Sequence, residues 1–147
     1  PVLTGTKIFK VKLVTTLSHM MVVVGLLSMI AGLKFTITEL MTLSYISLGG
    51  GFMLMILSIA NALRGVTNFT ATVKGVSASL IFAFFVTILG VMMLFEYASG
   101  SVGERHHIYA NIHSVWAIFG FSGLLIIGVA FQVLPMFYVA PHFKRFC

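Results

Sequence analysis

Charged side chains are scarce in this sequence. They make up 8% of the 147 residues, whereas 59% of the residues are hydrophobic. About a quarter of the residues in a water-soluble domain are charged, so this chain has too few charges to cover a water-facing surface. The apolar excess must therefore face lipid, which predicts an integral membrane protein.

Cysteine and acidic residues are also few. The single cysteine, Cys147, excludes a disulfide framework and a thiolate metal cluster. The three acids, Glu39, Glu96 and Glu104, fall at or beyond the ends of apolar runs, so no pair of carboxylates lies within the membrane. A glycine-rich phosphate loop is also absent from the sequence. These absences argue against hydrolase and nucleotide chemistry.

Four long apolar runs account for most of the chain, at residues 13–33, 40–63, 76–97 and 108–137. Each has the roughly 20 residues that a helix needs to cross a hydrocarbon core of about 30 Å. A backbone in lipid must satisfy its own hydrogen bonds, so the runs are expected to be helices. Short connections between them, at 34–39, 64–75 and 98–107, predict an all-α, up-down-up-down bundle of four antiparallel transmembrane helices.

The bundle is expected to form a single domain over residues 1–147. Because the first residue is Pro1 rather than methionine, the chain is expected to be processed or to be a fragment of a longer chain. The predicted partners are membrane lipid and, for a fragment, the other helices of a longer chain or complex. Nucleic acid is not expected as a partner, because the basic residues flank the apolar runs and do not cluster on one face.

The distribution of charge predicts the orientation of the helices. Seven of the nine basic residues lie on one side of the membrane in this arrangement: Lys7, Lys10, Lys12, Arg64, Lys74, Lys144 and Arg145. The other side has Lys34, Arg105 and all three acids. The positive-inside rule then places both termini in the cytoplasm, and we expect a location in a bacterial inner membrane.

Glycines within the runs have two interpretations. Gly25 and Gly32 lie seven residues apart on one face of the first run, as is typical of close helix packing. Gly49, Gly50 and Gly51 form a triplet that points all round the second helix, which exceeds the need of one packing face. The triplet therefore either packs neighbouring helices or leaves room for a flat cofactor.

Histidines are the main candidates for chemistry. His19 lies inside the first run, where an ionisable residue is a functional candidate by default. His106, His107 and His113 fall within eight residues, and imidazole is a common metal and haem ligand. His113 should lie deepest and is interpreted as a ligand or proton relay. His106 and His107 are candidate metal ligands or, alternatively, a polar cap at the interface.

A single haem with both His19 and His113 as axial ligands is a demanding arrangement. The two residues are expected to differ by on the order of 10 Å in membrane depth. One shared haem would need tilted helices or shifted boundaries, and separate sites or ligands from outside the chain are the alternatives.

The end of the fourth run supplies further candidates. Gln132 is a polar group at membrane depth, and Pro135 is expected to kink or end the helix. Met136 offers a thioether to copper or haem, although methionine is more often a filler of gaps.

The run from Ile112 to Phe137 resembles a signature of the NnrS-like membrane proteins and, more distantly, of the catalytic subunit of haem-copper oxidases. The signature begins with a histidine, here His113, and has glycines about two turns later, here Gly120 and Gly123. Gly128-Val129 and Phe131-Gln132 follow, and the signature ends with Pro135-Met136-Phe137. The resemblance implies a haem- or copper-associated membrane protein with His113 as a ligand. Those families have more helices and further ligand histidines, so this chain would be a fragment or a reduced relative.

Two functional hypotheses follow. The first is a haem- or copper-associated redox or nitric-oxide-response membrane domain, with His113 as ligand and His19 as second ligand or relay. The second is a non-enzymatic subunit or transporter fragment whose histidines and Gln132 are structural or line a polar path.

Overall fold

The computed structural model describes residues 11–66, 68 and 70–138, and these residues form four membrane-length helical spans. The first three spans are α1 (Val11–Phe35), α2 (Thr38–Arg64) and α3 (Ala71–Ala98). The fourth is one continuous helix of three parts: α4 (His106–Val115), the π-helical segment η1 (Trp116–Gly123) and α5 (Leu124–Tyr138). All four spans are long and apolar enough to cross a membrane, which confirms the predicted fold class.

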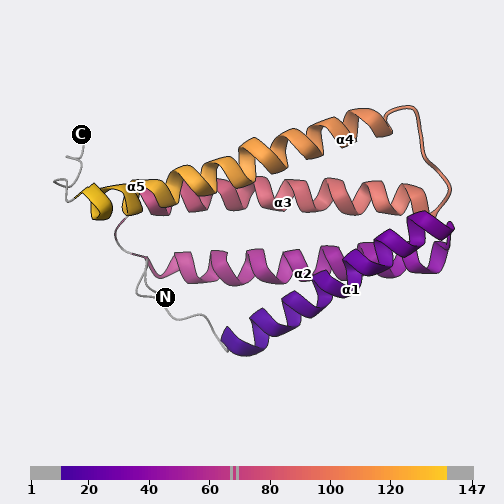
Figure 1. The fold of residues 1–147 in the computed structure, drawn as a ribbon, viewed down its shortest axis with the longest axis horizontal. Coiled ribbons are helices and arrows are strands. Elements are labelled where there is room, and N and C mark those ends of the chain that lie inside the picture. The colour runs from indigo at the N-terminus through magenta and orange to yellow at the C-terminus, as the bar shows by residue number, and fades with distance from the viewer. Residues whose placement is uncertain (1–10, 67, 69, 139–147) are drawn as a thin grey trace.

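The helices run antiparallel and contact one another in chain order (Figure 1). α2 packs against α1 and α3, and α3 also packs against the fourth helix. Among the described residues, no Cα atom of α1 or α2 comes within 8 Å of α4, η1 or α5. The backbones of the first two helices therefore do not pack against that of the last one, although Phe121 of η1 packs against the cluster that contains Ile56 of α2.

Small residues determine how closely the helices approach. The residues of α1 that α2 buries are Ser18, Gly25, Ser28 and Gly32. A Cβ on Gly25 would lie 2.7 Å from the Cγ of Leu48, so only hydrogen fits there. In lipid, where apolar burial does not drive helices together, close backbone packing of this kind stabilises the pair.

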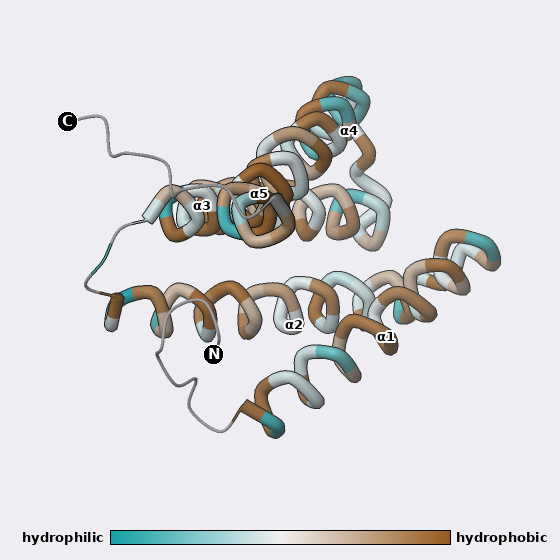
Figure 2. Tube along the Cα trace, turned by 60° about the vertical axis from the view of Figure 1, so that its left-hand side comes forward, coloured by the Kyte–Doolittle hydropathy of each residue, from teal (hydrophilic) through white to brown (hydrophobic). Residues whose placement is uncertain are grey.

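The tightest crossing joins α3 to α5. A Cβ on Gly75 would lie 2.6 Å from the Cα of Gly128, and a Cβ on Gly128 would lie 3.0 Å from the Cα of Gly75. Next to this crossing lies the buried cluster of Ile56, Leu80 and Ala83. Most other large apolar side chains face outward, and in Figure 2 hydrophobic residues surround the helices while hydrophilic ones gather mainly near their ends.

The helix boundaries differ slightly from the sequence expectation. α3 begins at Ala71 with Thr70 as its N-cap, whose side chain accepts a hydrogen bond from the Val73 N–H. Lys74 and Gly75 therefore lie in the first turns of α3 and not in the connecting loop. α5 continues past Pro135 to Tyr138, so the proline does not itself end the helix.

Charge separates the two ends of the bundle as expected. The end with Lys12, Arg64 and Lys74 is called the basic end, and the end with Glu39, Glu96 and Glu104 is called the acidic end. Lys7, Lys10, Lys144 and Arg145 belong to the predicted basic side but lie outside the described residues, as does Cys147.

Candidate functional site

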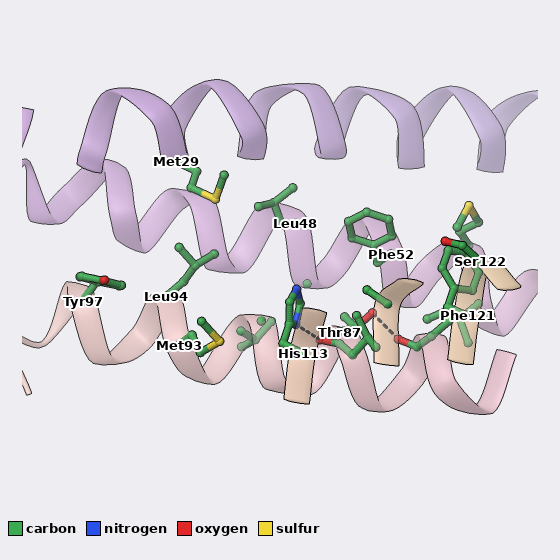
Figure 3. Close-up of a pocket in the computed structure, with 18 of the residues that line it drawn as sticks. Met29, Leu48, Phe52, Thr87, Met93, Leu94, Tyr97, His113, Phe121 and Ser122 are labelled. Atoms are coloured by element: carbon green, nitrogen blue, oxygen red, sulfur yellow. Dashed lines mark hydrogen bonds between the residues drawn. The ribbon is translucent and has the colours of Figure 1, made fainter. Parts of the chain in front are cut away.

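A cavity of about 540 Å³ lies between the helices, and all four spans contribute to its wall. α1 and α2 supply apolar side chains, and α3 forms the longest wall (Figure 3). Its lining includes Met29, Leu48, Phe52, Met93, His113 and Phe121. None of the described residues that line it is an aspartate, glutamate, lysine or arginine. The cavity is thus an apolar space at membrane depth with one imidazole in its wall.

His113 is held in place by the backbone of α3. Its Nδ1 lies 3.0 Å from the carbonyl oxygen of Val86. A carbonyl can only accept, so Nδ1 must donate its proton, and Nε2 keeps a free lone pair in the neutral ring. No described residue provides a hydrogen-bond partner for Nε2, and Figure 3 shows this second nitrogen directed toward the cavity.

Gly90 provides the space for this imidazole. A Cβ built on Gly90 would lie 3.0 Å from the Cε1 of His113 and 3.6 Å from its Nδ1. The ring therefore rests against the bare backbone of α3, one turn from the carbonyl that it binds. A larger residue at position 90 would push the ring away from Val86.

The π-helical segment begins three residues after His113. A π-helix pairs residues five apart, and such segments often occur at functional sites. Ala117 and Ser122 are five residues apart in η1, and both line the cavity together with Phe121. The wide winding thus keeps more of the fourth helix facing the cavity.

Aromatic contacts hold η1 against α3. Trp116 packs edge-on against Phe82, with ring centroids 5.7 Å apart, and against Phe85 at 6.0 Å. A Cβ on Gly120 would overlap the ring of Phe82. Aromatic packing and a glycine together bring this segment onto α3, next to His113.

The remaining polar groups of the cavity are few. The Thr87 hydroxyl donates to the Ala83 carbonyl oxygen at 2.8 Å, so its proton is already used within the helix. Tyr97 lies at the acidic end of the lining, seven residues beyond Gly90 on α3, which corresponds to about 10 Å along the helix. Ser122 of η1 also brings a hydroxyl to the lining. His113 is the one nitrogen-bearing side chain among the described lining residues, so it is the principal candidate there for binding a metal.

The other candidate histidines do not join His113. His19 is exposed on α1, a helix that does not approach the fourth span. His106 binds Glu96, with Nδ1 2.6 Å from Oε2, and its ring lies edge-on to Tyr97 at 4.8 Å. Glu96 and Val86 are ten residues apart on α3, so these two imidazoles bind α3 about 15 Å apart.

His107 is exposed at the start of α4. In the described part of the chain, no three side chains of histidine, cysteine, aspartate or glutamate come together as a metal site would require. The candidates near the end of the fourth span, Gln132, Pro135 and Met136, do not line the cavity, and Met136 is 74% exposed.

The glycine triplet has neighbouring helices on two sides. A Cβ on Gly49 would lie 2.6 Å from Cγ2 of Val91 on α3. A Cβ on Gly50 would lie 2.6 Å from Cε of Met21 on α1, and Gly51 is buried against the same helix. These contacts correspond to the first interpretation of the triplet, in which its glycines let neighbouring helices pack closely. Gly49 also belongs to the cavity lining.

Sequence reasoning missed the partners of the histidines. Val86 acts through its backbone, which no sequence pattern marks, and Gly90 is an isolated glycine in an apolar run. A signal existed for Glu96, because an acid and a histidine at the same end of adjacent spans are natural partners.

Comparison of the chain with protein-family models, curated proteins and solved structures gives no match. The resemblance of residues 112–137 to NnrS-like proteins and haem-copper oxidases therefore stays a prediction.

Proposed function

We propose that this chain is a membrane-embedded haem protein in which His113 is the histidine that binds the iron. The observation that carries the proposal is the setting of the imidazole: Nδ1 donates to the Val86 carbonyl, and Nε2 is free beside an apolar cavity. Histidines that bind metals nearly always use their other nitrogen in this way, which holds the ring and makes the ligand more basic. A histidine of this kind holds the haem iron in globins and peroxidases.

A single ligand favours ligand binding over simple electron transfer. His19 is exposed on a helix that does not approach α4, so it is not placed to occupy the second axial position. A haem bound through His113 alone would supply an iron with an open position, where a small molecule such as nitric oxide binds. The nitric-oxide-response form of the hypothesis is thus better supported than a bis-histidine electron carrier.

Copper is less well supported than haem. The lining methionines, Met29, Met55 and Met93, offer the thioether sulfur that suits Cu(I). However, no second histidine lies in the lining, and His106 and His107 are at the far end of α4.

The direct test is the visible spectrum of the protein, purified after expression with haem supplied, in oxidised and dithionite-reduced forms. We expect a Soret band that His113→Ala removes and that the matched variant His19→Ala leaves unchanged. A band that survives His113→Ala would overturn the assignment of the ligand. A colourless wild type without copper would instead favour a structural subunit or transporter fragment.

A second candidate ligand is an uncharged, hydroxylated apolar molecule, such as a quinol. The observation that favours it is the absence of lysine and arginine from the described lining, because a haem has two propionates that need partners. Nε2 of His113 would accept a hydrogen bond from the hydroxyl. Organic extraction of the purified protein with mass spectrometry tests this, and His113→Phe should reduce the amount of ligand recovered.

The proposed orientation has the basic end in the cytoplasm and the acidic end outside, in a bacterial inner membrane. Lys12, Arg64 and Lys74 at the basic end support it through the positive-inside rule. Reporter fusions to the two ends of the chain would test it, and a cytoplasmic signal is expected from both.

A further inference from the structure

We infer that the cavity around His113 is reached from the hydrocarbon core of the bilayer, between α1–α2 and the fourth helix, so that its ligand is uncharged and soluble in lipid. This inference rests on the proposed function, because the ligand meant is the small molecule that would bind at the open position of a haem held by His113, or the uncharged hydroxylated molecule of the second candidate. The haem itself, with its two charged propionates, is not the molecule that takes this route. It depends on where the cavity is closed and where it is open.

The basic end of the cavity is closed by packed side chains. Ile56 and Ala83 line the cavity and belong to the buried cluster with Leu80, against which Phe121 of η1 packs. Beyond this floor, α3 and α5 meet at the Gly75–Gly128 crossing, where not even a methyl group fits between the helices. The space between α3 and the fourth helix is therefore filled at this end of the cavity.

Tyr97 lines the acidic end of the cavity and is itself 41% exposed. Its ring packs edge-on against His106. His106 is in turn held by Glu96, with Nδ1 and Oε2 2.6 Å apart, and the two side chains are only 14% and 22% exposed. The pair joins the start of α4 to the end of α3 and so narrows the acidic end around Tyr97, and access from water at this end is the alternative that iodide tests.

A second hollow lies on the α2–α3 wall, and Gly49, Thr87 and Val91 line both it and the cavity. Cγ2 of Val91 would lie 2.6 Å from a Cβ on Gly49, so this side chain stands between α2 and α3 there. On the side between α1–α2 and the fourth helix, no Cα atoms approach within 8 Å in the described part of the chain, and the cavity is not enclosed. That side lies within the membrane-spanning length of all four helices, so a route through it is lateral. A charged ligand would not take this route, because hydrocarbon strongly disfavours ions.

Tryptophan fluorescence in bilayers tests the route without requiring a bound haem. Trp116 is the only tryptophan, so Trp116→Phe provides a background in which one probe is introduced at a time. The cavity probe is Phe121→Trp on η1, and Phe52→Trp on α2 is a second cavity probe if the first variant fails to fold. Phe119→Trp, at a position 71% exposed on the same segment, is the lipid-facing reference.

Each variant is placed in vesicles whose lipids have either plain or dibrominated acyl chains, and the brominated chains quench tryptophan from within the bilayer. Iodide is the quencher in water. Val102→Trp, in the loop at the acidic end, is the reference for a tryptophan that iodide reaches. We expect brominated lipid to quench the cavity probe to an extent comparable with the lipid-facing reference, and iodide to leave it unquenched. Quenching by iodide comparable with the loop reference would overturn the lateral route, as would a cavity probe that neither quencher reaches. The spectral test of haem is independent of this result, so either idea can fail alone.

Discussion

The crossing of α3 and α5 offers a prediction that can be worked from the structure. In Gly75→Ala, the new methyl group would lie 2.6 Å from the Cα of Gly128. The two helices would have to separate by roughly 1 Å to reach ordinary contact between carbon atoms. Such overpacking costs about 1–3 kcal/mol, and the better helix propensity of alanine offsets about 1 kcal/mol of it. We expect a net loss of about 1 kcal/mol, within a range of about 0–2 kcal/mol, or a roughly fivefold larger unfolding constant.

The assay is reversible unfolding in mixed micelles by added sodium dodecyl sulfate, followed by circular dichroism. Gly103→Ala is the matched control, because a Cβ on Gly103 meets nothing within 4 Å. Gly128→Ala should have a smaller effect, since its Cβ would lie 3.0 Å from Gly75, and the double variant should cost less than the two losses added. If Gly75→Ala is as stable as the wild type, the crossing is not as close as described and the reasoning fails.

Three further predictions concern the site and its supports. Gly90→Ala should displace the imidazole of His113 and lengthen its hydrogen bond to the Val86 carbonyl, which weakens cofactor binding by about fivefold for a hydrogen bond of about 1 kcal/mol. Haem titration measures this, and unchanged affinity would mean that the hydrogen bond does not hold the ring. Glu96→Gln should weaken the contact with His106 and speed amide hydrogen exchange at the start of α4, because a charge-assisted hydrogen bond is lost. Exchange as slow as in the wild type would mean that the His106–Glu96 contact does not hold the start of α4 against α3. Gly120→Ala should place a methyl group against the ring of Phe82 and lower the free energy of unfolding by about 1–3 kcal/mol. The near-ultraviolet circular dichroism of Trp116, which packs on the same ring, should change, and an unchanged signal would argue against the packing of η1 on α3.

Part of the candidate site was predictable. His113 was the histidine expected to lie deepest in the fourth run, and the structure places it in the wall of a cavity at membrane depth. His106 lies seven residues before it in the sequence, and both histidines bind α3. One haem shared by His19 and His113 would have required contact between the first and last helices, which the described bundle lacks.

The contacts that make the site were not predictable, because they use groups without a sequence signature. A backbone carbonyl at Val86 and the missing side chain of Gly90 define the position of the imidazole. The π-helical winding of η1 occurs where Trp116 and Gly120 pack against Phe82 of α3, a contact that the sequence does not reveal.

The number of spans, their approximate limits and the separation of charge between the two ends could all be predicted from the amino-acid sequence. Lipid imposes the spans on any chain, since each crossing needs about 20 apolar residues and an internally bonded helix. Which face of each helix meets its neighbour could not be predicted, and neither could the cavity or the separation of the histidines that follow from it. Apolar residues surround all four helices, because lipid and helix interfaces both accept them, so hydropathy carries no information about facing. Small residues and single polar groups determine the packing instead, and their partners become evident only when the helices are brought together.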